Sequence, residues 1–218
     1  TDTQIGEAKT YTTQRGQRAT VELPDGSSAM LAPESKLHYA VSADGERMLE
    51  LVGQAYFTVT ARHRAPFIVR SAGVATRVLG TAFSVRAYAG DAFTQVAVTE
   101  GKVSVGDAIH STILVAGDVG HAVPDEMPTV IRSNAMNVAL AWTRGEMVFE
   151  GVPFRDVAKE LERTYDVTVR LSGHTIQNLP ITIAFGDEPL SDVIHTLALT
   201  ANVRISRTGD TIIFTESR

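Results

Sequence analysis

Short runs of alternating hydrophobic and polar residues fill residues 10–123, with turn signals between the runs. Because side chains alternate between the two faces of a strand, runs of this kind that are rich in Val, Thr, Phe and Tyr predict β-strands. Asp25-Gly26 and Asp44-Gly45 are typical of hairpin turns. Residues 1–123 are therefore predicted to form a mainly β domain, rich in antiparallel pairs, of a sandwich or solenoid-like type. The predicted strands cover residues 18–23, 28–32, 47–53, 55–61, 66–71, 74–80, 81–88, 94–105 and 111–117.

The pattern changes after residue 123. Residues 124–141 contain two prolines and a polar run, which predicts a linker with one short helix after Ser133. Residues 142–218 hold two helical periods set between strands, which predicts a small α+β domain.

The second domain carries an internal repeat, with an offset of 36 residues between segments 149–171 and 185–207. Each copy reads strand, turn, helix and strand, so the domain is predicted to contain two β-α-β repeats. A proline precedes each helix, and an aspartate in each first turn suits the positive end of the helix dipole. Each predicted helix has one apolar stripe, formed by Phe154, Val157, Ala158, Leu161 and Tyr165 in the first copy and by Leu190, Val193, Ile194, Leu197 and Ala201 in the second.

Composition and charge exclude several classes of function. The net charge of −5 gives no basic footprint for nucleic acid. No apolar run approaches the about 20 residues of a transmembrane helix. The absence of cysteine excludes disulfides, thiolate metal ligands and cysteine nucleophiles. With no nucleophile elbow, no phosphate loop and no metal-ligand spacing, we expect no cofactor, no metal and no hydrolytic enzyme. The histidines behind this expectation are His38, His63, His110, His121, His174 and His195.

Several motifs resemble the periplasmic part of FecR-type anti-sigma regulators, the iron-dicitrate sensor family. VELPDGSSAMLAPESKLHY (21–39) resembles the family's L-x-D-G-S … L-x-x-x-S-x-L-x-Y stretch. LVGQAYFTV (51–59) resembles its L-x-G-E-A-Y-F-x-V stretch, with Gln54 in place of the glutamate. APFIV, VLGTAFSVRAY and VTEGKVSV continue the resemblance. Residues 142–218 resemble the short domain shared by secretins and the N-termini of TonB-dependent receptors.

The resemblance implies a function. Regulators of this family cross the inner membrane of Gram-negative bacteria once, and a cytoplasmic N-terminal segment holds an extracytoplasmic-function sigma factor. The periplasmic part receives a signal from the signalling domain of an outer-membrane TonB-dependent receptor, which often takes up an iron siderophore. Proteolysis by periplasmic and intramembrane proteases then releases the sigma factor. Because the chain begins at Thr1, we expect the sigma-binding segment and the membrane helix to lie upstream of it.

The bond between Gly80 and Thr81 is the candidate catalytic site. Several family members are thought to cut themselves at a Gly-Thr bond, and VLGTAFSV (78–85) places such a bond at the matching motif. The Thr81 hydroxyl can attack the Gly80 carbonyl through a five-membered ring, giving an ester that water opens. Glycine leaves this carbonyl unshielded. On the other reading, Gly80 only allows a bend, a bulge or a close approach between strands, and Thr81 is simply a good strand residue.

Receptor contact is expected on the α+β domain, because the edge strand of a small sheet can accept an added strand. The segment TIIFTE (211–216) is the candidate edge, with Thr211, Ile213 and Thr215 as the partner-binding residues. The other reading of this segment is that its apolar residues fill the core.

Two further features complete the interpretation. Arg62-His63-Arg64 is read as a solvated turn, and Trp142, the only tryptophan, as a packing anchor between the two halves. The rival function is that of a periplasmic structural or carbohydrate-binding β-protein. A cleft lined by exposed aromatic residues would favour this rival, and only 6% of the residues are aromatic.

Overall fold

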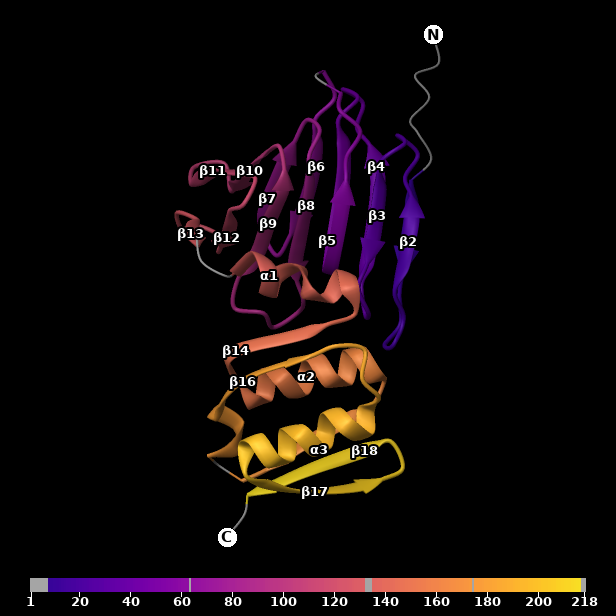
Figure 1. The fold of residues 1–218 in the computed structure, drawn as a ribbon. Coiled ribbons are helices and arrows are strands. Elements are labelled where there is room, and N and C mark those ends of the chain that lie inside the picture. The colour runs from indigo at the N-terminus through magenta and orange to yellow at the C-terminus, as the bar shows by residue number, and fades with distance from the viewer. Residues whose placement is uncertain (1–7, 63, 132–134, 174, 217–218) are drawn as a thin grey trace. The chain divides into compact units, whose positions relative to one another are not determined.

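The computed structural model describes residues 8–62, 64–131, 135–173 and 175–216 (Figure 1). The chain divides into two compact units, Thr1–Leu140 and Ala141–Arg218, here called unit 1 and unit 2. Unit 1 is built mainly of strands, and unit 2 combines helices with two small sheets.

Strands make up most of unit 1, as the alternating pattern predicted. Its described part holds β1 (Lys9–Thr12), β2 (Ala19–Glu22), β3 (Ser28–Leu31), β4 (Lys36–Val41), β5 (Arg47–Thr58), β6 (Phe67–Ser71), β7 (Val74–Val78), β8 (Ala82–Ala87), β9 (Thr94–Glu100), β10 (Lys102–Gly106), β11 (Ser111–Val115), β12 (Val119–Ala122) and β13 (Thr129–Ile131).

The long strand β5 belongs to both layers of the unit. Its first half pairs with β4 and β6, and its second half pairs with β3 and β8. One layer continues through β7, β10 and β11, and the other through β9, β12 and β13. Of these pairings only β5 with β6 is parallel. The prediction of a mainly β domain rich in antiparallel pairs is confirmed.

The hydrophobic core of unit 1 lies between these layers. Phe57, in the second half of β5, has its ring centroid 5.3 Å from that of Phe83 on β8. The same ring meets Phe67 on β6 edge to face, at 5.7 Å. All three side chains have 0% exposure, so a single aromatic cluster joins the two layers.

Some strand boundaries differ from the prediction. The predicted strands 47–53 and 55–61 are one continuous strand, β5. The predicted strand 94–105 is two strands, because Gly101 turns the chain with a φ of 81° between β9 and β10. Strands β1, β4, β12 and β13 lie outside the predicted ranges.

The segment 124–141, predicted as a linker, is mostly structured. Strand β13 pairs with β12, and helix α1 (Ala135–Leu140) follows in the place of the predicted short helix. Ala139 of α1 packs against Ala97 and Val119. These contacts place β13 and α1 in unit 1, because β13 extends the sheet and the apolar residues of α1 cover strands β9 and β12, whereas Ala141 already begins unit 2.

Unit 2 follows the predicted repeat. Its elements are the 3₁₀ helix η1 (Ala141–Arg144), β14 (Met147–Pro153), α2 (Phe154–Tyr165), β15 (Thr168–Ser172), the 3₁₀ helix η2 (Ile176–Asn178), β16 (Pro180–Phe185), α3 (Leu190–Ala201), β17 (Val203–Thr208) and β18 (Thr211–Glu216). The copies are β14-α2-β15 and β16-α3-β17, so the two β-α-β repeats are confirmed.

The two helices of unit 2 lie between its two sheets (Figure 1). Strands β14 and β16 form one antiparallel pair, and β15, β18 and β17 form the other sheet in that order. Both helices end in the same way, at Asp166 and Asn202, each in the left-handed conformation with a φ of 52°. The predicted apolar stripes face the shared core, with Phe154, Leu161 and Leu197 fully buried.

Candidate functional site

The Gly80-Thr81 bond lies in the short connection between β7 and β8, beside the segment that follows β5. The Val59 backbone N–H donates to the Thr81 carbonyl at 3.0 Å, and the Arg62 N–H donates to the Leu79 carbonyl at 2.9 Å. The bond is therefore held against residues 59–62 by hydrogen bonds on both sides of it.

Gly80 is required by a close approach of two backbones. A Cβ atom added to Gly80 would lie 2.6 Å from both the Cα and the Cβ of Ala61, closer than such atoms approach in real structures. The bulge in this region lies one step further on, where the pairing of β8 with β9 shifts between Ala82 and Phe83. Of the structural readings of this glycine, close approach is the one that the geometry supports.

Thr81 is 5% exposed, and its hydroxyl is fixed. Its Oγ1 donates to the Lys102 carbonyl at 3.1 Å. The facing residue is Gly101, where an added Cβ would lie 3.0 Å from Thr81 Oγ1 and 3.1 Å from the Gly80 carbonyl oxygen. The hydroxyl oxygen that would attack and the oxygen of the carbonyl group that would be attacked therefore face the same glycine, which carries no side chain beside them.

A buried ion pair anchors the segment next to the bond. Arg47 is 1% exposed, and its Nη1 donates to Asp25 Oδ2 at 2.7 Å. Arg47 also donates to the carbonyls of Thr60 and Ala65, at 2.9 Å and 2.8 Å. Arg62 donates to the Asp25 carbonyl at 2.8 Å. The turn at Asp25 is thus tied to Thr60, Arg62 and Ala65, and these bonds hold the segment after β5 that contacts Gly80.

The part of unit 1 before the bond and the part after it are paired along two ladders. Strand β5 pairs with β8 over Gly53–Thr58 and Ala82–Ala87, and β7 pairs with β10. Both ladders join strands from opposite sides of the Gly80-Thr81 bond. A chain cut there keeps these hydrogen bonds and its aromatic cluster.

The predicted edge strand is not an edge. Strand β18 lies between β15 and β17 and is paired along both sides. Ile212 and Phe214 have 0% exposure, whereas Thr211, Ile213 and Thr215 are half-buried on the opposite face of the sheet. The most apolar strand occupies the centre because it buries the most surface there. The edges of this sheet are β15 and β17.

The other two features that the sequence singles out are the Arg62-His63-Arg64 turn and Trp142. Arg62 is exposed but holds the Asp25 turn, while His63 lies outside the described residues and Arg64 is exposed. Trp142 is half-buried in η1, at the start of unit 2, and its role as an anchor stays a prediction.

In the described part of the chain, no three His, Asp or Glu side chains lie close enough together to hold a metal ion. His195 is exposed on α3. His121 stacks on Phe93 at 3.8 Å, and burial lowers the pKa of His121. His63 and His174 lie outside the described residues.

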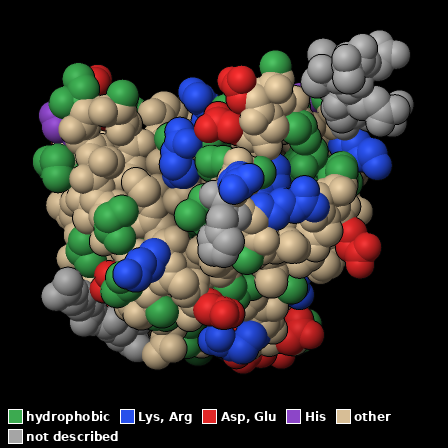
Figure 2. All heavy atoms as spheres, turned by 90° about the horizontal axis from the view of Figure 1, so that it is seen from above, with side chains coloured by type: hydrophobic (Ala, Val, Ile, Leu, Met, Phe, Trp, Pro, Cys, Tyr) green, Lys and Arg blue, Asp and Glu red, His purple; other side chains and the backbone are tan. Residues whose placement is uncertain are grey.

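The face of the molecule drawn in Figure 2 is mixed in charge. Figure 2 shows Lys and Arg side chains lying among Asp and Glu side chains and small hydrophobic areas on one face of the molecule. Within the described ranges, no helix is long and apolar enough to cross a bilayer.

Comparisons with known proteins agree with the fold. Two crystal structures of a "putative anti-sigma factor" from Parabacteroides distasonis ATCC 8503 are each 24% identical to this chain. One covers 97% of this chain and 100% of its own with a TM-score of 0.87, and the other covers 96% and 100% with a TM-score of 0.86. At this identity the likeness shows a shared fold. No curated protein matches the chain significantly in sequence.

Two family models match the two units in order. The model described as "FecR protein" matches residues 9–104, within unit 1. The model described as "FecR, C-terminal" matches residues 146–214, within unit 2. Together they span most of the sequence and agree with the motifs at residues 21–39 and 51–59. The chain therefore belongs to the FecR family.

Proposed function

We propose that this chain is the periplasmic signal-receiving region of a membrane-anchored anti-sigma regulator. It binds the signalling domain of an outer-membrane TonB-dependent receptor and controls the release of an extracytoplasmic-function sigma factor, which a segment outside this chain holds. The observation that supports the proposal is the ordered match of the FecR and FecR C-terminal models to the two units. The described residues offer sheet edges and charged helix faces, which suit protein–protein contact.

The second part of the proposal is a single self-cleavage at Gly80-Thr81. Thr81 Oγ1 attacks the Gly80 carbonyl carbon, its proton passes to the amide nitrogen, and the C–N bond breaks. The product is an ester between Gly80 and the Thr81 oxygen, with a free amine on Thr81. Water then hydrolyses the ester to the Gly80 carboxylate and the Thr81 hydroxyl. The space left by Gly101 beside both reacting groups supports this step.

A cut chain is suited to mechanical signalling. The β5–β8 and β7–β10 ladders and the core keep the two pieces together at rest. A pull between the upstream membrane segment and a receptor-bound unit 2 loads these ladders, because the pieces carry opposite ends of the chain. Separation exposes the edge and apolar face of β5 to proteases, which then release the sigma factor.

The receptor-binding part is tested by calorimetric titration. The full chain is titrated with the N-terminal signalling domains of the TonB-dependent receptors encoded in the same genome. We expect one domain to bind with a Kd in the micromolar range or tighter, whereas the others serve as matched controls. If no signalling domain binds, the proposed function is wrong.

The self-cleavage part is tested by the denatured mass of freshly purified protein. We expect two fragments, one ending at Gly80 and one beginning at Thr81. Thr81→Ser keeps a hydroxyl and should still give both fragments, whereas Thr81→Val keeps the shape and should give one intact chain. Equal cutting of the Thr81→Val variant would show that another agent cuts the bond.

A further inference from the structure

Strand β15 is an edge of the three-stranded sheet in unit 2. It runs parallel to β18, and the Thr168 N–H donates to the Asp210 carbonyl on the β18 side at 2.9 Å. In a strand, successive residues direct their backbone groups to opposite edges. Val169 and Leu171 therefore direct their N–H and C=O groups to the outer edge of β15.

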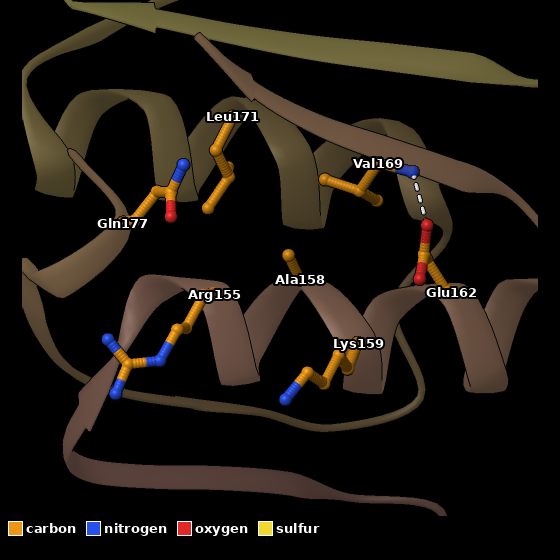
Figure 3. Close-up of a pocket in the computed structure, with 7 residues that line it drawn as sticks. All are labelled: Arg155, Ala158, Lys159, Glu162, Val169, Leu171 and Gln177. Carbon is orange, nitrogen blue, oxygen red and sulfur yellow. Dashed lines mark hydrogen bonds between the residues drawn. The ribbon is translucent and has the colours of Figure 1, made fainter. Parts of the chain in front are cut away.

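A side chain already occupies part of this edge. Glu162 of α2 accepts a hydrogen bond from the Val169 N–H at 2.8 Å (Figure 3). Its carboxylate oxygen takes the position that the carbonyl of an added strand would take. A charged side chain at an edge strand is one of the ways in which proteins protect an edge from unwanted pairing.

A groove of about 230 Å³ runs between this edge and α2. Its floor is apolar, formed by Ala158, Val169 and Leu171 (Figure 3). Arg155 and Lys159 line it from α2, with side chains 48% and 46% exposed.

Both cations already have exposed partners, and Arg155 Nη1 donates to Asn178 Oδ1. Both lie near Asp156, at 3.8 Å from Arg155 and 2.8 Å from Lys159. Exposed ion pairs of this kind contribute little, so an incoming carboxylate can replace Asp156 at little cost. The groove therefore combines an apolar floor, a strand edge and positive charge.

We propose that an extended segment of the receptor's signalling domain, carrying an acidic side chain, docks in this groove as an added strand on β15. This inference rests on the proposed function and names its contact surface. The segment's carbonyl replaces Glu162 on the Val169 N–H, its apolar side chain covers the floor, and its carboxylate pairs with Arg155 and Lys159. One hydrogen bond replaces another at Val169, so the exchange is nearly neutral, and the apolar and charged contacts supply the affinity.

The test uses the full chain and the receptor signalling domain that binds it in titration. Lys159→Glu and Arg155→Glu should each weaken binding by about tenfold, because each reverses a charge that faces the acidic side chain. Arg170→Glu is the matched control. Arg170 is exposed on the same strand, and its side chain points to the opposite face, so this change should leave Kd within about twofold.

Two further readouts separate pairing on the edge from general charge attraction. Hydrogen exchange at the Leu171 amide should slow in the complex, because this amide gains a hydrogen bond to the added strand, whereas the Val169 amide only exchanges Glu162 for a new acceptor. Glu162→Ala removes the internal competitor and should tighten binding a few-fold. A purely electrostatic contact would be weakened by Lys159→Glu without protecting the Leu171 amide.

The outcomes distinguish this inference from the function on which it rests. If a signalling domain binds the wild-type chain but Arg170→Glu weakens it as much as Lys159→Glu, or if β17 amides become protected instead, the docking site is wrong and the function stands. If sedimentation shows that the chain alone dimerises through the Lys159-sensitive surface, the occupant is a second copy and the inference fails. If no signalling domain binds, both fail.

Discussion

Removal of the Asp25 carboxylate should destabilise unit 1, because it leaves the Arg47 guanidinium buried without its counter-charge. Both side chains of this pair are 2% exposed, and the bond between them is 2.7 Å long. Asp25 also accepts from the Ser27 N–H and hydroxyl, at 3.1 Å and 2.7 Å. Asp25→Ala therefore breaks three hydrogen bonds and leaves the buried charge of Arg47 without its counter-charge.

The magnitude follows from this burial. Breaking a buried pair by removing one partner typically costs about 3–5 kcal/mol. Arg47 keeps its bonds to the carbonyls of Thr60 and Ala65, which places the expected loss near the lower end, at about 3 kcal/mol. In a unit of this size, a loss of this order lowers Tm by about 10 °C.

The assay is urea unfolding of the full chain. Hydrogen exchange of the amides in the strands of unit 1 reports on that unit, and the fluorescence of Trp142 reports on unit 2 as an internal reference. Arg77→Ala is the control in the same unit, because its pair with Glu46 is 3.3 Å long and 51% and 35% exposed. We expect this control to lose less than about 1 kcal/mol.

A double variant sharpens the test. Arg47→Met removes the stranded charge and keeps an apolar chain against Phe67, whose ring lies 5.2 Å from the guanidinium. Asp25→Ala combined with Arg47→Met should therefore be more stable than Asp25→Ala alone. The reasoning is refuted if Asp25→Ala costs no more than Arg77→Ala, or if the double variant recovers nothing.

Two further predictions concern packing and pH. Gly80→Ala should lose about 2 kcal/mol by urea unfolding, because its Cβ would lie 2.6 Å from Ala61, whereas Gly186→Ala meets nothing closer than 3.9 Å; equal losses would contradict the close approach. Hydrogen bonds from backbone N–H groups lower the pKa of the Asp107 carboxyl to about 2, and the bond from His110 has the largest effect. Because this pKa is depressed in the folded chain, the stabilisation is present above about pH 4 and is lost toward about pH 2. Asp107→Asn should remove that part of the acid sensitivity. If the urea midpoint of the wild-type chain falls no more between about pH 4 and about pH 2 than that of Asp107→Asn, the prediction is contradicted.

Much of the fold could be predicted because its signals are local. The Asp25-Gly26 and Asp44-Gly45 turns join β2 to β3 and β4 to β5, as their dipeptides indicate. The two helices of unit 2 were predicted from stripes within about three turns of chain, and the repeat placed them between strands.

The order of strands could not be predicted, because it depends on contacts between distant segments. Alternation along residues 211–216 is the same for a central strand and for an edge strand. Only the pairing of β18 with both β15 and β17 decides between them. The run of three consecutive apolar residues, Ile212, Ile213 and Phe214, was the one available signal for a central position.

The surroundings of the candidate site could not be predicted either, because they also depend on contacts between distant segments. The sequence singles out Gly80 but carries no local sign that Ala61 approaches it. Asp25 and Arg47 are 22 residues apart and follow no spacing that would pair them. The Glu162 bond to Val169 depends on how α2 packs on β15, which a helical period does not specify.

The measurement that tests the central claim most directly is transcription from a promoter that depends on the partner sigma factor, in cells carrying the full-length regulator. The account predicts that the receptor's ligand changes this transcription with the wild-type regulator. The change should be lost when residues 146–214 are deleted, whether the regulator inhibits or also activates its sigma factor. An unchanged response to the ligand after that deletion would contradict the account.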